Sequence, residues 1–197
     1  MKNILIAGAA SLALLAACNQ GDDTAGQNTS EAVNATQDAA AGMVGQTSAA
    51  TLGANTVDGF VTNLAEGNMY EIEAARIAQT KSNNADVKAL ASMIEEDHTA
   101  AGEKLRSTAS TAAPDVTMPT MLDQRRQGMI DNLNAAAPDD FDKVYLDQQV
   151  AAHNETLTLL NGFSDNSDAP ALATLAREMI PTITKHRDRA QALVNGM

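Results

Sequence analysis

The stretch ADVKALASMIEEDHTAAGEKL, residues 85–105, decides the fold class of this chain. Its apolar residues return every three or four positions, which is the spacing that places side chains on one face of an α-helix. Asn84 stands directly before the stretch, where an asparagine is well suited to cap the first turn. The stretch therefore predicts an amphipathic helix with an apolar face made of Val87, Leu90, Ala91, Ile94, Ala101 and Leu105.

The same spacing recurs on both sides of this stretch. One long helix is predicted before it and two after it, the latter starting near Asp140 and at Pro170, and a shorter helical piece over about 120–135 lies in the middle connection. Pro181 falls opposite the apolar face of the last helix, so we expect a bend there rather than a break. Four long helices with short outer turns predict an all-α, up-down four-helix bundle over residues 57–197.

Few polar residues fall within the apolar faces, and they include every histidine of the chain. Each long helix turns one titratable side chain inward: Glu71, His98, His153 and His186. Imidazole together with carboxylate is a common set of metal ligands. These four residues are therefore candidate ligands of a single transition-metal ion, Zn or Cu. The competing interpretation, which we take as the default, is a buried hydrogen-bonded network that fixes helix register without binding anything.

Axial position distinguishes among the four candidates. At about 1.5 Å per residue, Glu71 and His98 lie at nearly the same height and are expected to pair, with His153 close to that level. His186 is expected about 9 Å away from His153 along the bundle, unless helix stagger or the Pro181 bend absorbs the offset. Burial should lower the pKa of His153, whereas pairing with Glu71 should raise the pKa of His98.

Several short motifs make the chain resemble the family known as domain of unknown function 4142. They are Gly67–Glu73, the pair Asp97-His98, Phe141–Leu146 with His153 after it, and Ile180-Pro181 followed by His186. The resemblance covers residues 57–195. It implies a ferritin-like four-helix bundle in exported bacterial proteins, and it implies no activity.

A ferritin-like fold does not by itself imply a di-iron centre. That centre requires a Glu on each of two helices and Glu-x-x-His on each of the other two. Only Glu95 and His98 fit the second pattern, because Val150 and Ile183 stand three residues before the other two histidines. We therefore expect no ferroxidase chemistry.

The N-terminus predicts export and lipidation. Lys2 precedes an apolar stretch, residues 4–15, that is too short to remain as a membrane-spanning helix. Leu15-Ala16-Ala17-Cys18 then resembles the cleavage and acylation motif of bacterial lipoproteins. Residues 1–17 are therefore expected to be a signal peptide, and Cys18 is expected to carry acyl chains that anchor the protein to the membrane, on the periplasmic face of the outer membrane.

The segment 18–56 is almost entirely small and polar, which predicts a disordered tether between the anchor and the bundle. A formal net charge of −12 makes nucleic acid an improbable partner. No nucleophile elbow or phosphate-binding glycine loop is present, so we expect a non-enzymatic protein. The loop Val116–Leu122 is the one candidate for a protein-interaction patch, and its Met118 and Met121 could offer soft sulfur to Cu(I).

Overall fold

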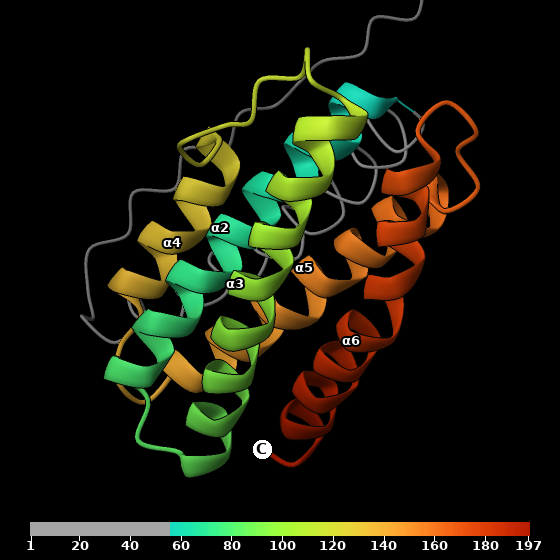
Figure 1. The fold of residues 1–197 in the computed structure, drawn as a ribbon. Helices are drawn as coiled ribbons and strands as arrows, with labels where there is room; N and C mark the ends of the chain where they lie inside the picture. Colours follow the sequence, from blue (N-terminus) through green and yellow to red (C-terminus); the bar gives the residue numbers. More distant parts are fainter. Residues whose placement is uncertain (1–55) are drawn as a thin grey trace, which may run out of the picture.

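The computed structural model describes residues 56–197 and contains five α-helices and no strand in that range (Figure 1). The expected signal peptide (residues 1–17), Cys18 and all but the last residue of the expected tether (18–56) lie outside the described residues. None of the helices in the described range is long and apolar enough to cross a membrane. The helices are α2 (Val57–Lys81), α3 (Ala85–Ala112), α4 (Gln124–Ala135), α5 (Phe141–Phe163) and α6 (Pro170–Asn195).

The helix starts follow the capping residues in the sequence. Asn84 accepts hydrogen bonds from the backbone N–H groups of Asp86 and Val87, which confirms the predicted cap of α3. Asp123 caps α4 in the same way through the backbone N–H of Arg126. The last helix, α6, continues through Pro181 without a break. Pro181 is exposed, so the backbone hydrogen bond that proline cannot donate is missing on the solvent face of the helix.

The four long helices close into a ring around the core. Helix α2 packs against α3 and α5, and α6 packs against α5 and α3, so each long helix has two long neighbours. Helix α4 lies outside this ring and packs on α2 and α5 (Figure 1). An all-helical bundle is therefore confirmed, with one short helix added to its flank.

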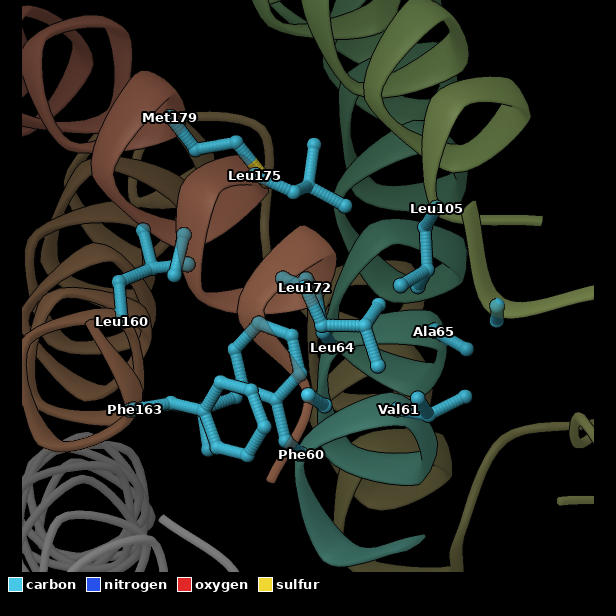
Figure 2. Packing of buried hydrophobic residues seen from close by; sticks show 14 of the residues in the cluster. Phe60, Val61, Leu64, Ala65, Leu105, Leu160, Phe163, Leu172, Leu175 and Met179 are labelled. Atoms are coloured by element: carbon cyan, nitrogen blue, oxygen red, sulfur yellow. The ribbon is translucent and has the colours of Figure 1, made fainter. Parts of the chain in front are cut away.

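The apolar core consists of two separate clusters. The first contains the N-terminal half of α2, the C-terminal halves of α3 and α5, and the first part of α6. Phe60 and Phe163 stack there with ring centroids 4.0 Å apart and an interplanar angle of 11° (Figure 2). Burial of each such ring contributes about 1.5–3 kcal/mol. The second cluster, around Tyr70, Leu90, Ile130 and Phe141, fills the opposite end and includes α4.

On each of the four long helices, buried polar residues lie between the residues that belong to one cluster and those that belong to the other. We call them the polar layer. The division of the core into two parts is not evident from the apolar spacing, because each apolar face reads as continuous along its helix. The polar layer consists of Asn68, Glu71, His98, Gln148, Gln149, His153 and His186.

Candidate metal centre

Three histidines from three helices meet inside the polar layer. His98 on α3, His153 on α5 and His186 on α6 are exposed by 2%, 1% and 0%, respectively. Their ring centroids are 5.3–5.6 Å apart. One ring nitrogen of each residue lies within 4.8 Å of the corresponding nitrogens of the other two. The structure therefore brings together three of the four candidates from the sequence.

Each imidazole has one ring nitrogen held by a hydrogen-bond acceptor. His98 Nδ1 lies 2.8 Å from Asn68 Oδ1, and His153 Nδ1 lies 2.8 Å from the main-chain oxygen of Gln149. His186 Nε2 lies 2.8 Å from a carboxylate oxygen of Asp97. Because all three partners accept hydrogen bonds, these nitrogens carry the protons of the neutral rings. The opposite nitrogens are therefore lone-pair donors.

Those opposite nitrogens have no hydrogen-bond partner among the residues that the structure describes. They are Nε2 of His98, Nε2 of His153 and Nδ1 of His186, and we call them the candidate ligand nitrogens. A buried polar atom without a partner costs about 1–3 kcal/mol, so three of them in one layer require an explanation. A cation shared by the three lone pairs would satisfy all of them together.

The environment keeps the three rings uncharged. Burial, together with the neighbouring His186, lowers the pKa of His153 to about 3. Burial and the two other rings place the pKa of His98 well below 6.5. Burial also lowers the pKa of His186, although Asp97 opposes the shift. Neutral imidazole is the form that binds metal, so protons do not compete for this centre near neutral pH.

The arrangement matches the ligand geometry of Zn²⁺ after a small contraction. Zn–N bonds of about 2.0–2.1 Å place two ligand nitrogens about 3.4 Å apart in a tetrahedral site. Since one ring nitrogen of each histidine lies within 4.8 Å of one from each of the other two, such nitrogens would have to approach by no more than about 1.4 Å. Partners such as Asn68, Asp97 and the Gln149 carbonyl orient such ligands in metal sites and fix their tautomers.

Glu71 lies beside the three histidines and outside their set. Its carboxylate oxygen Oε1 is 3.5 Å from His153 Nδ1, the nitrogen that faces Gln149 rather than the candidate ligand nitrogen. Burial raises the pKa of Glu71 to about 8, with the Gln149 side chain and Arg126 acting in the opposite direction. The carboxyl group is therefore largely protonated at neutral pH. It belongs to the polar layer, but it is not positioned as a metal ligand.

The expected pairing of Glu71 with His98 is wrong, and so is the pKa increase that it would have caused in His98. Asn68 bonds His98 instead. It stands one helical turn before Glu71 on the same face of α2, and being neutral it leaves the pKa of His98 depressed. That one-turn spacing was the available signal for Asn68 in the sequence.

The expected 9 Å offset of His186 is also wrong, since its ring centroid lies 5.3 Å from that of His153. Side chains on an α-helix lean toward its N-terminus. Helices α5 and α6 are joined by a short turn, so the lean carries His186 toward that turn and His153 away from it. The two displacements cancel most of the offset between the backbones.

A second buried polar region lies under α4 and was not anticipated. We call it the arginine cluster: Arg125, Arg126, Glu66, Asp123 and Glu155. Arg126 is 2.9 Å from Glu66 and 3.1 Å from Glu155, and it also contacts Asp123. Arg125 binds both oxygens of Glu155 at 2.7 and 2.9 Å. A sequence pattern that looks for apolar faces treats these charges as solvated, which hid the cluster.

The middle loop gives little support to a binding patch or a sulfur site. Val116, Met118 and Leu122 are partly buried against the core clusters. Met121 is 75% exposed and is one of two exposed large apolar residues in the described range, the other being Met197 at 66%. Met118 and Met121 therefore differ strongly in environment, and a single exposed side chain does not form an apolar patch.

Comparison with known proteins gives one result. The sequence pattern of a protein family described as Domain of unknown function (DUF4142) matches residues 41–193. The match spans all five helices nearly to the end of α6 and begins before α2. No curated protein and no solved structure matches the chain.

Proposed function

Since the chain belongs to the family described as Domain of unknown function (DUF4142), a description that states no activity, we propose a function from the site itself. His98, His153 and His186 bind one transition-metal ion, Zn or Cu, inside the bundle. The observation that carries this proposal is that three buried rings lie together and that each keeps one buried ring nitrogen without a hydrogen-bond partner in residues 56–197.

The site supports holding a metal better than turning over a substrate. Two larger cavities, of about 510 and 540 Å³, open on the bundle, and none of the three histidines lines either of them. A substrate in those cavities would not reach the ion. We therefore propose a non-enzymatic role in which the protein binds the metal and does not perform a reaction with it.

The setting that we propose is the cell envelope. A signal peptide over residues 1–17 and acyl chains on Cys18 would anchor the protein, and the tether would hold the bundle away from the membrane surface. We also propose that the ring of four long helices is an up-down bundle of the ferritin-like type. The ring of contacts between α2, α3, α6 and α5 supports this topology.

Elemental analysis tests the metal proposal directly. Full-length protein stripped with chelator and reloaded with Zn²⁺ or Cu should retain close to one ion per chain after gel filtration. His153→Ala should lose it. Glu95→Gln is the matched control, because Glu95 pairs with Arg76 and the Glu-x-x-His spacing makes it the other conceivable ligand next to His98. Retention of the ion by His153→Ala, or no uptake by the wild type, would leave the hydrogen-bonded network as the function of the layer.

Stability provides a second readout of the same proposal. At a free Zn²⁺ concentration about a hundredfold above the dissociation constant, the free energy of unfolding should rise by about 2.7 kcal/mol. Denaturant titration with and without Zn²⁺ measures this gain. His186→Ala should show no gain, whereas Glu95→Gln should respond like the wild type.

Membrane fractionation tests the anchor. Acylation requires the sulfur of Cys18, so Cys18→Ser should move the protein from the membrane pellet to the soluble fraction in high salt. Unchanged sedimentation of that variant with the membranes would contradict the lipoprotein assignment.

A further inference from the structure

A metal ion that binds the three histidines has to cross the packed bundle, and two adjoining cavities lead toward them. The outer one, about 510 Å³, is lined among others by Asp123, Arg126 and Glu155. The inner one, about 10 Å³, is lined by Glu155, Arg126 and also by Glu71. Arg125 lines both as well. The arginine cluster therefore stands between solvent and the polar layer.

The carboxylates along this line become steadily less exposed. The side chain of Asp123 is 33% exposed, that of Glu155 is 9% exposed and that of Glu71 is 2% exposed. Glu71 in turn lies 3.5 Å from His153. The order runs from the surface to a candidate ligand, and carboxylate oxygen is a group that divalent cations accept.

The innermost carboxyl group has His153 Nδ1 at 3.5 Å and the Gln149 side chain acting on it, but neither oxygen makes a hydrogen bond of ordinary geometry among the described residues. Both Oε1 and Oε2 of Glu71 are buried and make no hydrogen bond, although the group lines the inner cavity. The other carboxylates of the line already bind arginine. Glu71 is thus a buried acceptor aimed at a space on the way to the histidines.

We infer that Asp123, Glu155 and Glu71 form an access path that carries a divalent cation to the three histidines, and that Arg125 and Arg126 close this path until a cation displaces them. This inference rests on the proposed metal function. A guanidinium between carboxylates occupies the position that a passing cation would take. The inner cavity, about the volume of one water molecule, is too narrow while Arg126 stays in place.

The last step passes His153. Glu71 contacts Nδ1 of this ring, and the candidate ligand nitrogen is Nε2 on its other side. The side chain of His153 therefore has to rotate and release its hydrogen bond to the Gln149 carbonyl for the ion to reach the centre. The Nδ1–H group re-forms that bond once the ion is bound.

The cavity of about 540 Å³ between α2 and α3 is the competing route. Met69, Met118, Glu103 and Asn68 are among the residues that line it. Asn68 Nδ2 is buried and has no partner in residues 56–197, so an N–H donor faces any ion that enters there. That amide hydrogen repels a cation, whereas the Glu71 carboxyl group offers oxygens that a cation binds once it displaces the proton, which favours the path under α4.

The rate of metal uptake tests the inference in the full-length chain. Co²⁺ is the probe, because its visible absorption reports nitrogen coordination in place of Zn²⁺ and is followed by stopped-flow mixing. Glu155→Gln should slow uptake about tenfold, and Arg125→Gln should accelerate it about tenfold, with final occupancy unchanged in both. Glu103→Gln removes the same charge at the competing cavity and should take up Co²⁺ at the wild-type rate.

The signs of the two changes separate a path from a purely structural cluster. If the cluster only fastens α4, both substitutions loosen it and both accelerate uptake, which would overturn the inference. Equal slowing by Glu155→Gln and Glu103→Gln would also overturn it, since long-range charge would then explain the rates. Circular dichroism confirms that each variant is folded. Absence of Co²⁺ binding in the wild type would instead remove the proposed function itself.

Discussion

In the arginine cluster each buried charge meets an opposite charge, whereas in the polar layer each neutral imidazole keeps one nitrogen without a partner among the described residues. Arg126 and Glu155 are less than a tenth exposed and are joined by ion pairs. His98 and His153 are as deeply buried and keep a free nitrogen each. The first arrangement is satisfied within the chain itself. The second is incomplete, and an incomplete buried site is the kind that a ligand completes.

The largest expected change in stability concerns the arginine cluster, in which the buried charges are paired. Arg126→Met removes the cation that three carboxylates share and leaves Glu66, Asp123 and Glu155 with Arg125 alone. Breaking a buried ion pair from one side costs about 3–5 kcal/mol. Urea unfolding should show a loss of this size. A loss below about 1 kcal/mol would mean that the cluster behaves like an exposed surface pair.

The next largest effect is the dependence of stability on pH, which tests whether the groups of the polar layer are neutral in the fold. Histidines with lowered pKa values bind fewer protons in the fold than in the unfolded chain, so stability falls as pH drops below 6.5. Glu71 has a raised pKa, so its contribution is complete below 4.5 and is lost as pH rises through about 8. Metal-free protein should therefore be most stable near pH 6.5.

The size of each change in the free energy of unfolding follows from how many groups titrate: three histidines at lower pH and Glu71 alone at higher pH. Between pH 6.5 and 5 the histidines outweigh Glu71, and the net loss should be about 1–3 kcal/mol. Above pH 6.5 only Glu71 acts, and stability should decline slowly. Chemical denaturation at several pH values in the presence of chelator measures the profile. Stability that rises steadily from pH 5 to 8 would show that Glu71 is ionised in the fold, and the layer would then hold a charge.

The smallest effect concerns an orienting residue. Asn68→Ala removes the acceptor of His98 Nδ1–H and should cost about 1–2 kcal/mol in metal-free protein. Loss of such a partner in metal sites typically weakens binding about 10–100-fold. Competition with a chelator of known affinity measures this. Asn63→Ala is the control, because Asn63 is on the same helix and bonds only the backbone oxygen of Gly59.

The sequence was sufficient for the long helices because they follow from local apolar spacing, with a side-chain cap at α3 and a first-turn proline at α6. Asn84, Pro170 and the apolar face of α3 act within a few residues of themselves, and the structure agrees with all three. Grouping the three histidines was also possible, because a polar residue on an apolar face is conspicuous. The family resemblance is confirmed by the match over residues 41–193.

The hydrogen-bond partners of those histidines could not be predicted from local spacing. The choice of Asn68 over Glu71 as the partner of His98 depends on differences of one helical turn between two helices. A rise per residue gives backbone height but omits the lean of the side chains, which is why His186 was misplaced. Arg126 and Glu155 are 29 positions apart in the sequence, and their burial depends on where α4 docks. Long-range docking of a short helix has no local signature.

The division of the apolar core also determines how the molecule comes apart. Each of the four long helices contributes to both clusters, so none of them can detach without disrupting both ends of the bundle. Helix α4 contributes Met129, Ile130 and Leu133 to one cluster only. Native-state hydrogen exchange should therefore show α4 opening as a separate unit, at a lower free energy than global unfolding, while the amides of the four long helices exchange together.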